Sequence, residues 1–162
     1  MRRIGILAIF CLVLALPLFC QSTQENEKPD ILCHKIPDDW QVVNTGPVEL
    51  KIPPKWHARR LMGIDTYIMS ISGEGVYLYL EHGHKIDQYF LMDYGEQGRK
   101  HFTMNGRNME LVLSPETSVT GTVGIAFGIK TGRFALHGND LYLYQRDIVL
   151  KIFSTIEVKK GF

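Results

Sequence analysis

The stretch Val48-Glu49-Leu50-Lys51-Ile52 alternates apolar and polar side chains, and Pro53-Pro54 follows it directly. Alternation with a period of two is typical of a β-strand that buries one of its faces. Proline ends such a strand because it has no N–H group to donate to the hydrogen-bond ladder. The pattern therefore predicts a strand over 48–52.

Similar β-prone runs recur along the chain, separated by short turns that contain glycine, asparagine or aspartate. Further strands are expected over residues 66–71, 76–80, 89–92, 109–113, 123–129 and 141–144. Turns are expected at Gly73-Glu74-Gly75, His82-Gly83-His84 and Gly138-Asn139-Asp140, because glycine and short polar residues adopt turn conformations readily. About seven strands with such short connections predict an antiparallel sheet.

The last segment of the chain has a helical pattern instead. Its apolar residues recur at i, i+1, i+4, i+5 and i+8, namely Ile148, Val149, Ile152, Phe153 and Ile156. We predict an amphipathic helix over 147–155, which Asp147 could cap. A strand is the alternative, because isoleucine and valine are β-branched. A short helical turn is also predicted over 55–62, so the expected fold class is α+β, an antiparallel β-sheet flanked by one or two helices.

Length and composition limit the possible classes of protein. The chain has 162 residues, a hydrophobic content of 45% and a formal net charge of +1. These values fit a single domain with a buried core. A nucleic-acid partner is not expected, because nucleic-acid binding surfaces are usually strongly basic.

The N-terminal residues are expected to direct export. A basic start, Arg2-Arg3, precedes an uncharged apolar run over 4–19, which is the pattern of a secretory signal peptide over 1–20. A retained membrane anchor is the alternative, although the run is short for one and contains Pro17. Residues 21–30 are predicted to be a disordered linker, and residues 31–162 a single α+β domain.

Two cysteines raise questions of modification. Cys20 closes the apolar run, where a bacterial lipoprotein would carry its lipid, but Leu18 and Phe19 replace the small residues of that signal. Lipidation at Cys20 and ordinary cleavage beside it both stay open. We interpret Cys33 as a small buried apolar residue, with an intermolecular disulfide as the alternative.

Some segments resemble a known family. The sequence Leu50-Lys51-Ile52-Pro53-Pro54-Lys55-Trp56 resembles the strand, proline and tryptophan that begin PsbP-like domains. Residues 153–157 resemble the close of their final helix, and residues 63–67 and 92–95 are similar to segments of secreted bacterial proteins of this kind. The resemblance covers roughly 47–158. It implies an antiparallel sheet flanked by helices, in an exported protein or lipoprotein that binds or assembles and has no catalytic residues.

A pair of histidines is the candidate metal site. His82 and His84 stand at i and i+2, with Glu81 and Asp87 close by in the sequence. Two imidazoles and a carboxylate on one side of a strand would suit zinc or a similar divalent ion. Exposed histidines in a hairpin turn are the interpretation that we prefer, and no cofactor is expected.

Tyrosines are the most distinctive feature of the predicted strands. Tyr77 and Tyr79 should share one face of a strand, and Tyr142 and Tyr144 another. We interpret the aromatic residues as ordinary sheet packing. If their faces are exposed, they form a platform for a protein, peptide or glycan partner. Around residues 141–144, we expect the leucines inside and the tyrosines outside.

Together these patterns predict an exported or envelope-anchored domain with a non-enzymatic binding or assembly role. Its expected partner is a protein, a peptide or a glycan, and it would meet a membrane only through a lipid at Cys20. A metal-dependent enzyme that uses His82 and His84 is one alternative. A structural protein of the envelope is the other.

Overall fold

The computed structural model describes residues 30–63, 65–84, 86, 98–115 and 118–162. Its elements, in chain order, are η1 Asp30–Leu32, β1 Gln41–Asn44, β2 Val48–Ile52, β3 His57–Leu61, β4 Thr66–Gly73, β5 Val76–Gly83, β6 Arg99–Met104, β7 Arg107–Leu113, β8 Thr120–Ile129, β9 Gly132–Tyr142, α2 Leu143–Ser154 and β10 Glu157–Val158. The predicted α+β class is confirmed. The predicted signal peptide, the lipidation site Cys20 and the strand over 89–92 lie outside the described residues.

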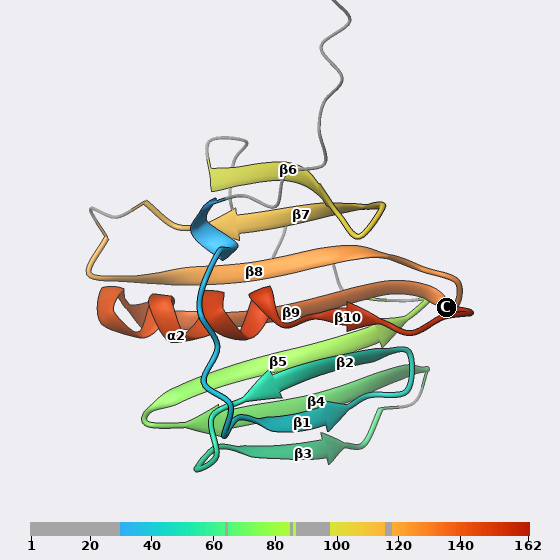
Figure 1. Ribbon diagram of the computed structural model, residues 1–162, viewed down its shortest axis with the longest axis horizontal. Coiled ribbons are helices and arrows are strands. Elements are labelled where there is room, and N and C mark those ends of the chain that lie inside the picture. Colours follow the sequence, from blue (N-terminus) through green and yellow to red (C-terminus); the bar gives the residue numbers. More distant parts are fainter. Residues whose placement is uncertain (1–29, 64, 85, 87–97, 116–117) are drawn as a thin grey trace, which may run out of the picture.

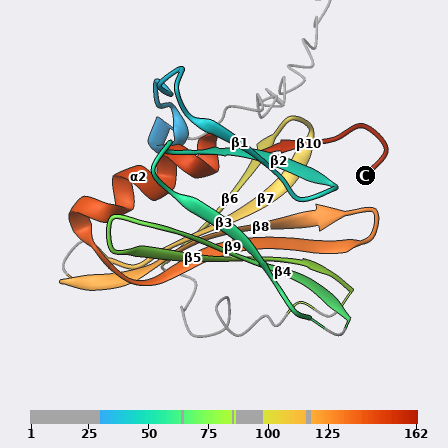
Figure 2. The ribbon, with the colours of Figure 1, turned by 90° about the horizontal axis from the view of Figure 1, so that it is seen from below.

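The strands form two antiparallel sheets (Figure 1). The small sheet has the order β1-β2-β10, and the large sheet has the order β3-β4-β5-β9-β8-β7-β6. Helix α2 and the small sheet lie on the same side of the large sheet, as Figure 2 shows. In the order of the described strands, β3 and β6 are the outermost strands of the large sheet. Each carries three basic side chains: His57, Arg59 and Arg60 on β3, and Arg99, Lys100 and His101 on β6.

Two tight hairpins show how the local sequence sets the register. Glu74 and Gly75 both have positive φ angles, of 52° and 76°, and so do Asn105 and Gly106, at 53° and 73°. Two successive residues with positive φ are typical of the two-residue turns that match the twist of antiparallel strands. The first turn holds β4 against β5 with Gly73 opposite Val76, and the second holds β6 against β7 with Met104 opposite Arg107.

The core lies between the large sheet and the layer formed by α2 and the small sheet. On the central strands, the inward-facing residues Leu78, Leu80, Ile125 and Leu136 are fully buried. From the other layer, Leu50, Ile52, Val149, Ile152 and Phe153 are buried against them. Within the large sheet, alternate residues of a strand therefore face either this core or the opposite side of the sheet. We call this opposite side the outer face.

The predicted helical turn over 55–62 is wrong. A turn does precede this segment, because the Trp56 N–H donates to the Pro53 carbonyl at 3.0 Å. From His57 onward, however, the chain pairs with β4 along its whole length as β3, with His57 opposite Ser72 and Leu61 opposite Ile68. Trp56 is the buried residue that fixes this strand, while the residues of β3 stay mostly exposed at the sheet edge.

The helix over 147–155 is confirmed over most of its length, but it begins earlier than predicted. It starts at Leu143 and ends at Ser154, and the Tyr142 N–H donates to Gln145 Oε1 at 2.9 Å. Gln145 rather than Asp147 therefore satisfies a backbone donor at this end. The expected turn at 138–140 is absent from the described chain, because β9 continues through it to Tyr142.

Cys33 is exposed, so its interpretation as a small buried residue is wrong, and Leu32 of η1 is the residue that enters the core here.

Within the described residues, no helix combines the length and the apolar character needed to span a bilayer.

Candidate functional site: an exposed tyrosine corner

The outer face of the large sheet positions the first pair of tyrosines. Strand β5 runs beside β9 with Tyr79 opposite His137, and its inward residues Val76, Leu78 and Leu80 are buried. Tyr77 and Tyr79 must then point outward, and their exposed fractions are 66% and 43%. The two tyrosines share a face as predicted, but the interpretation of them as packed side chains is wrong.

The second pair lies where β9 ends and α2 begins. Tyr142 is the last residue of β9 and Tyr144 is the second residue of α2, yet their rings stack with centroids 5.7 Å apart and an interplanar angle of 10°. Their exposed fractions are 47% and 74%. The packing interpretation is wrong for this pair too, and the prediction that both tyrosines lie outside is confirmed.

The leucines of this segment do not behave alike. Leu141 is buried, as predicted, but Leu143 is 47% exposed. The alternation of a strand stops at Tyr142, so Leu143 follows the geometry of a helix and turns away from the sheet. The prediction is therefore right for Leu141 and wrong for Leu143.

Tyr77 of the first pair and both tyrosines of the second pair belong to one end of the molecule. Strands β5 and β9 are antiparallel neighbours, so Tyr77 at the start of β5 lies at the same end as Tyr142 at the end of β9. Gln145 Nε2 donates to the Gly75 carbonyl at 3.3 Å and ties the first turn of α2 to the β4–β5 turn. Val119, also exposed, precedes Thr120, which is paired with Tyr142. We call Tyr77, Val119, Tyr142, Leu143 and Tyr144 the tyrosine corner.

A buried arginine organises the loop beside this corner. Arg146 of α2 is almost completely buried. Its Nη1 donates to the carbonyls of Ser114 and Pro115 at 3.1 and 3.2 Å, and its Nη2 to that of Ser118 at 3.4 Å. Gly121 leaves the necessary room, because a Cβ atom there would lie 2.7 Å from Arg146 Nη2. Sequence reasoning missed this role, since nothing in the pattern of α2 marks one basic residue as inward-facing.

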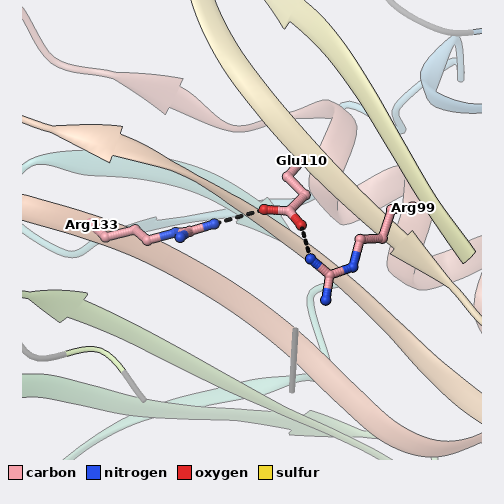
Figure 3. Close-up of polar contacts among 3 residues, drawn as sticks. All are labelled: Arg99, Glu110 and Arg133. Atoms are coloured by element: carbon pink, nitrogen blue, oxygen red, sulfur yellow. Dashed lines mark hydrogen bonds and ion pairs between the residues drawn. The ribbon is translucent and has the colours of Figure 1, made fainter. Parts of the chain in front are cut away.

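An ion-pair network crosses the outer face farther from the corner (Figure 3). Glu110 on β7 accepts from Arg99 Nη1 at 3.0 Å and from Arg133 Nη2 at 2.7 Å. Arg99 belongs to the neighbouring strand β6, but Arg133 belongs to β9, beyond β8. The residue of β8 opposite Glu110 is Ala126, whose small side chain leaves the path across β8 open. The network therefore links three strands, and we assign it a structural role.

Among the described residues, the surroundings of His82 consist of an aromatic ring, a guanidinium group and a backbone carbonyl. The rings of His82 and Tyr67 stack with centroids 4.5 Å apart, and the Arg60 guanidinium lies 4.9 Å from the Tyr67 centroid. His82 Nε2 lies 3.1 Å from the Thr45 carbonyl oxygen, so the tautomer with its proton on Nε2 donates there. Burial lowers the pKa of His82, the Thr45 hydrogen bond opposes this shift, and the charge of Arg60 adds to it.

A metal at this place stays a prediction. His84 is exposed, and no three His, Cys, Asp or Glu side chains gather into a possible metal site in the part of the chain that the structure describes. Asp87, one of the carboxylates near the pair in sequence, lies outside the described residues. Strand β5 extends to Gly83, so His82 and Gly83 of the turn predicted at 82–84 belong to a strand instead.

His137 makes the stability of the domain depend on pH. Burial lowers its pKa to about 4 from an ordinary value of 6.5, against the opposing effect of a hydrogen bond with Asn139. Between pH 6.5 and 4 the unfolded chain therefore binds a proton that the folded chain excludes, so acidification favours unfolding. We expect the free energy of unfolding to fall by about 2–3 kcal/mol over this interval because of His137.

The measurement is urea unfolding at pH values from 7 to 4, with a His137→Gln variant as the control. The variant should lose this part of the pH dependence and keep the part that comes from carboxylates. Parallel curves for the two proteins would contradict the assignment.

No known protein family matches this chain, and no curated protein matches it either.

Proposed function

We propose that this protein is an exported or envelope-anchored binding or assembly domain without enzymatic activity. The observation that carries the proposal is the tyrosine corner, where three tyrosine side chains, one leucine and one valine are exposed at one end of the domain. Tyrosine supplies a large contact area with few rotatable bonds, and it is enriched among the residues that contribute most to protein–protein binding. We therefore expect a partner molecule, rather than water, to cover this exposed aromatic surface.

The proposal of export rests on the sequence. The basic start and the uncharged run over 4–19 are the features of a signal peptide, and Cys20 is the place where a lipid would be attached. We also propose that the fold is PsbP-like. This proposal is supported by the order of β2, the turn that begins at Pro53 and the buried Trp56. The same order of strand, proline and tryptophan is the point of resemblance to PsbP-like domains.

Photo-crosslinking tests the binding role directly. A benzophenone amino acid in place of Tyr144 should give a defined crosslinked species when the full chain is made in its native cells. The matched control is the same amino acid in place of Val42, which is 60% exposed on β1 of the small sheet, outside the tyrosine corner.

Crosslinking at Tyr144 but not at Val42 is the expected result. Equal labelling at both positions, or no species at either, would contradict the proposal. The second of these results would favour the alternative of a structural envelope protein.

A further inference from the structure

We propose that the end of the domain opposite the tyrosine corner docks on an anionic lipid surface. This inference goes beyond the proposed function, in which the protein meets a membrane only through a lipid at Cys20. It is carried by apolar side chains exposed at the tips of turns and by exposed basic residues beside them. We call the following residues the basic end: Arg59, Arg60, Met62, Lys130, Lys160 and Phe162.

Connections from both sheets gather at this end, which is on the right of Figure 1. Thr66 at the start of β4 is opposite Gly83 at the end of β5, and Gly83 is opposite Arg133 at the start of β9. The C-terminal residues lie here as well, because the Lys159 N–H donates to the Pro47 carbonyl at 2.9 Å. The β1–β2, β3–β4 and β8–β9 connections and the C-terminal residues therefore belong to one end of the domain.

Apolar side chains are exposed at two of these tips. Met62 in the β3–β4 connection is fully exposed. The connection itself is tight, because a Cβ atom on Gly63 would lie 2.1 Å from the Thr66 carbonyl oxygen. Phe162 is partly exposed, and Arg107 Nη2 donates to its carbonyl oxygen. Binding to a membrane surface strengthens with the apolar area that enters the interface and with attraction to anionic lipids.

The basic residues beside these tips are free of carboxylates in the described chain. Arg59 and Arg60 are exposed on β3, and the Arg60 guanidinium lies 4.9 Å from the centre of the Tyr67 ring. Lys130 in the β8–β9 turn and Lys160 after β10 are also exposed. None of these four basic residues takes part in an ion pair within the part of the chain that the structure describes.

The acidic residues of this end do not balance that charge. Glu49 pairs with Lys159 at 3.0 Å, so these two charges cancel. Asp65 in the β3–β4 connection and Glu157 on β10 are the exposed acidic residues among those described here. Farther back, the outer face carries two arginines and two glutamates, which balance: Arg99, Arg133, Glu81 and Glu110. The four basic residues of the basic end therefore exceed the two acidic ones, and this end is positively charged.

The spacing of the exposed side chains favours a flat partner. Met62 follows β3 and Lys130 follows β8, and four steps separate these strands in the order β3-β4-β5-β9-β8. Neighbouring strands are about 4.8 Å apart, so the two connections lie roughly 19 Å apart. An anionic lipid surface can contact both and attract the basic residues. An acidic peptide would bind the cations but would give Met62 no apolar surroundings.

Fluorescence quenching tests whether the basic end enters a membrane. The full chain with Met62→Trp is mixed with vesicles that carry bromine on their acyl chains, because bromine quenches a nearby indole. The native Trp40 and Trp56 are buried and should not respond. Phosphatidylglycerol vesicles should quench the indole introduced at position 62 at least about fivefold more than phosphatidylcholine vesicles do. Added salt should weaken the quenching, because it screens exposed charges.

Tyr144→Trp places the same reporter in the tyrosine corner, at the opposite end, and should not be quenched by either lipid. The comparison is local to each indole. A chain that both kinds of vesicle hold through the apolar run over 4–19 would still report lipid contact at position 62 separately from position 144.

Charge variants separate the basic end from general attraction. In the Met62→Trp protein, Lys130→Gln with Lys160→Gln should raise the phosphatidylglycerol concentration needed for half-maximal quenching about tenfold. The reason is that each lysine near an anionic surface contributes to binding. The control pair, Lys35→Gln with Lys55→Gln, removes two exposed lysines elsewhere and should change that concentration by less than about twofold.

Equal quenching by the two lipids, equal quenching at positions 62 and 144, or equal effects of the two lysine pairs would overturn the inference. The absence of quenching would overturn it too, and binding of a labelled polyglutamate peptide instead would assign this end to an acidic protein. The binding role of the tyrosine corner is tested by crosslinking at Tyr144 and does not depend on these results.

Discussion

Replacing Gly132 with alanine should lower the free energy of unfolding by more than about 3 kcal/mol. Gly132 begins β9 with a φ of 125°, a conformation that side chains rarely allow. A Cβ atom there would lie 2.2 Å from the Gly83 carbonyl oxygen and 2.9 Å from the His84 nitrogen. Both are backbone atoms that cannot rotate away, so β9 would have to separate from the end of β5.

Gly128→Ala is the matched control for this variant. Gly128 lies in the same β8–β9 hairpin, but a Cβ atom at this position would have no neighbour within 4 Å. The control should therefore unfold within about 0.5 kcal/mol of the original protein, as followed by circular dichroism in urea. If the two variants have equal midpoints, the close approach of β9 to β5 does not exist in solution.

Replacing Arg146 with methionine should lower the free energy of unfolding by about 3 kcal/mol or more. Methionine fills much of the same volume but donates no hydrogen bond, so the carbonyls of Ser114 and Ser118 lose the Arg146 donor, while the Pro115 carbonyl keeps the Ser118 N–H. A buried acceptor without a donor costs about 1–3 kcal/mol. Arg146→Lys should recover only part of the loss, because one ammonium group cannot replace the planar fork of a guanidinium.

Lys151→Met supplies the control for charge and helix propensity, because Lys151 lies on α2 and is only partly buried. It should change stability by less than about 0.5 kcal/mol. Urea unfolding of the three variants gives the comparison. A methionine variant at position 146 that is as stable as the control would show that Arg146 does not hold the loop.

The sequence was sufficient for the elements whose periodicity is strong. The alternation over 48–52 corresponds to β2, and the helical spacing from Ile148 to Phe153 corresponds to α2, which ends at Ser154 before Ile156. The segment after Trp56 was misjudged, because its basic residues show no alternation. Pairing with β4 decides its conformation, and long-range pairing overrides weak local preference.

The candidate surface was predictable in part. Tyr77 and Tyr79 share a face because strands alternate, but their exposure depends on which layer covers the sheet, and a period of two does not specify this. The stacking of Tyr142 on Tyr144 arises at a change from strand to helix, where neither period applies. Arg146 and the Glu110 network were missed because their partners are distant in the chain.

The basic residues at the two edges of the large sheet have a consequence for self-association. A sheet edge carries unpaired N–H and C=O groups that can recruit another chain into an aggregate. Here His57, Arg59 and Arg60 line one edge, and Arg99, Lys100 and His101 the other. Arg99 is paired with Glu110, but Arg59, Arg60 and Lys100 carry positive charge, so two copies that approach edge to edge bring like charges together. This repulsion should keep the protein monodisperse when it is concentrated at low salt, and added salt should weaken the protection.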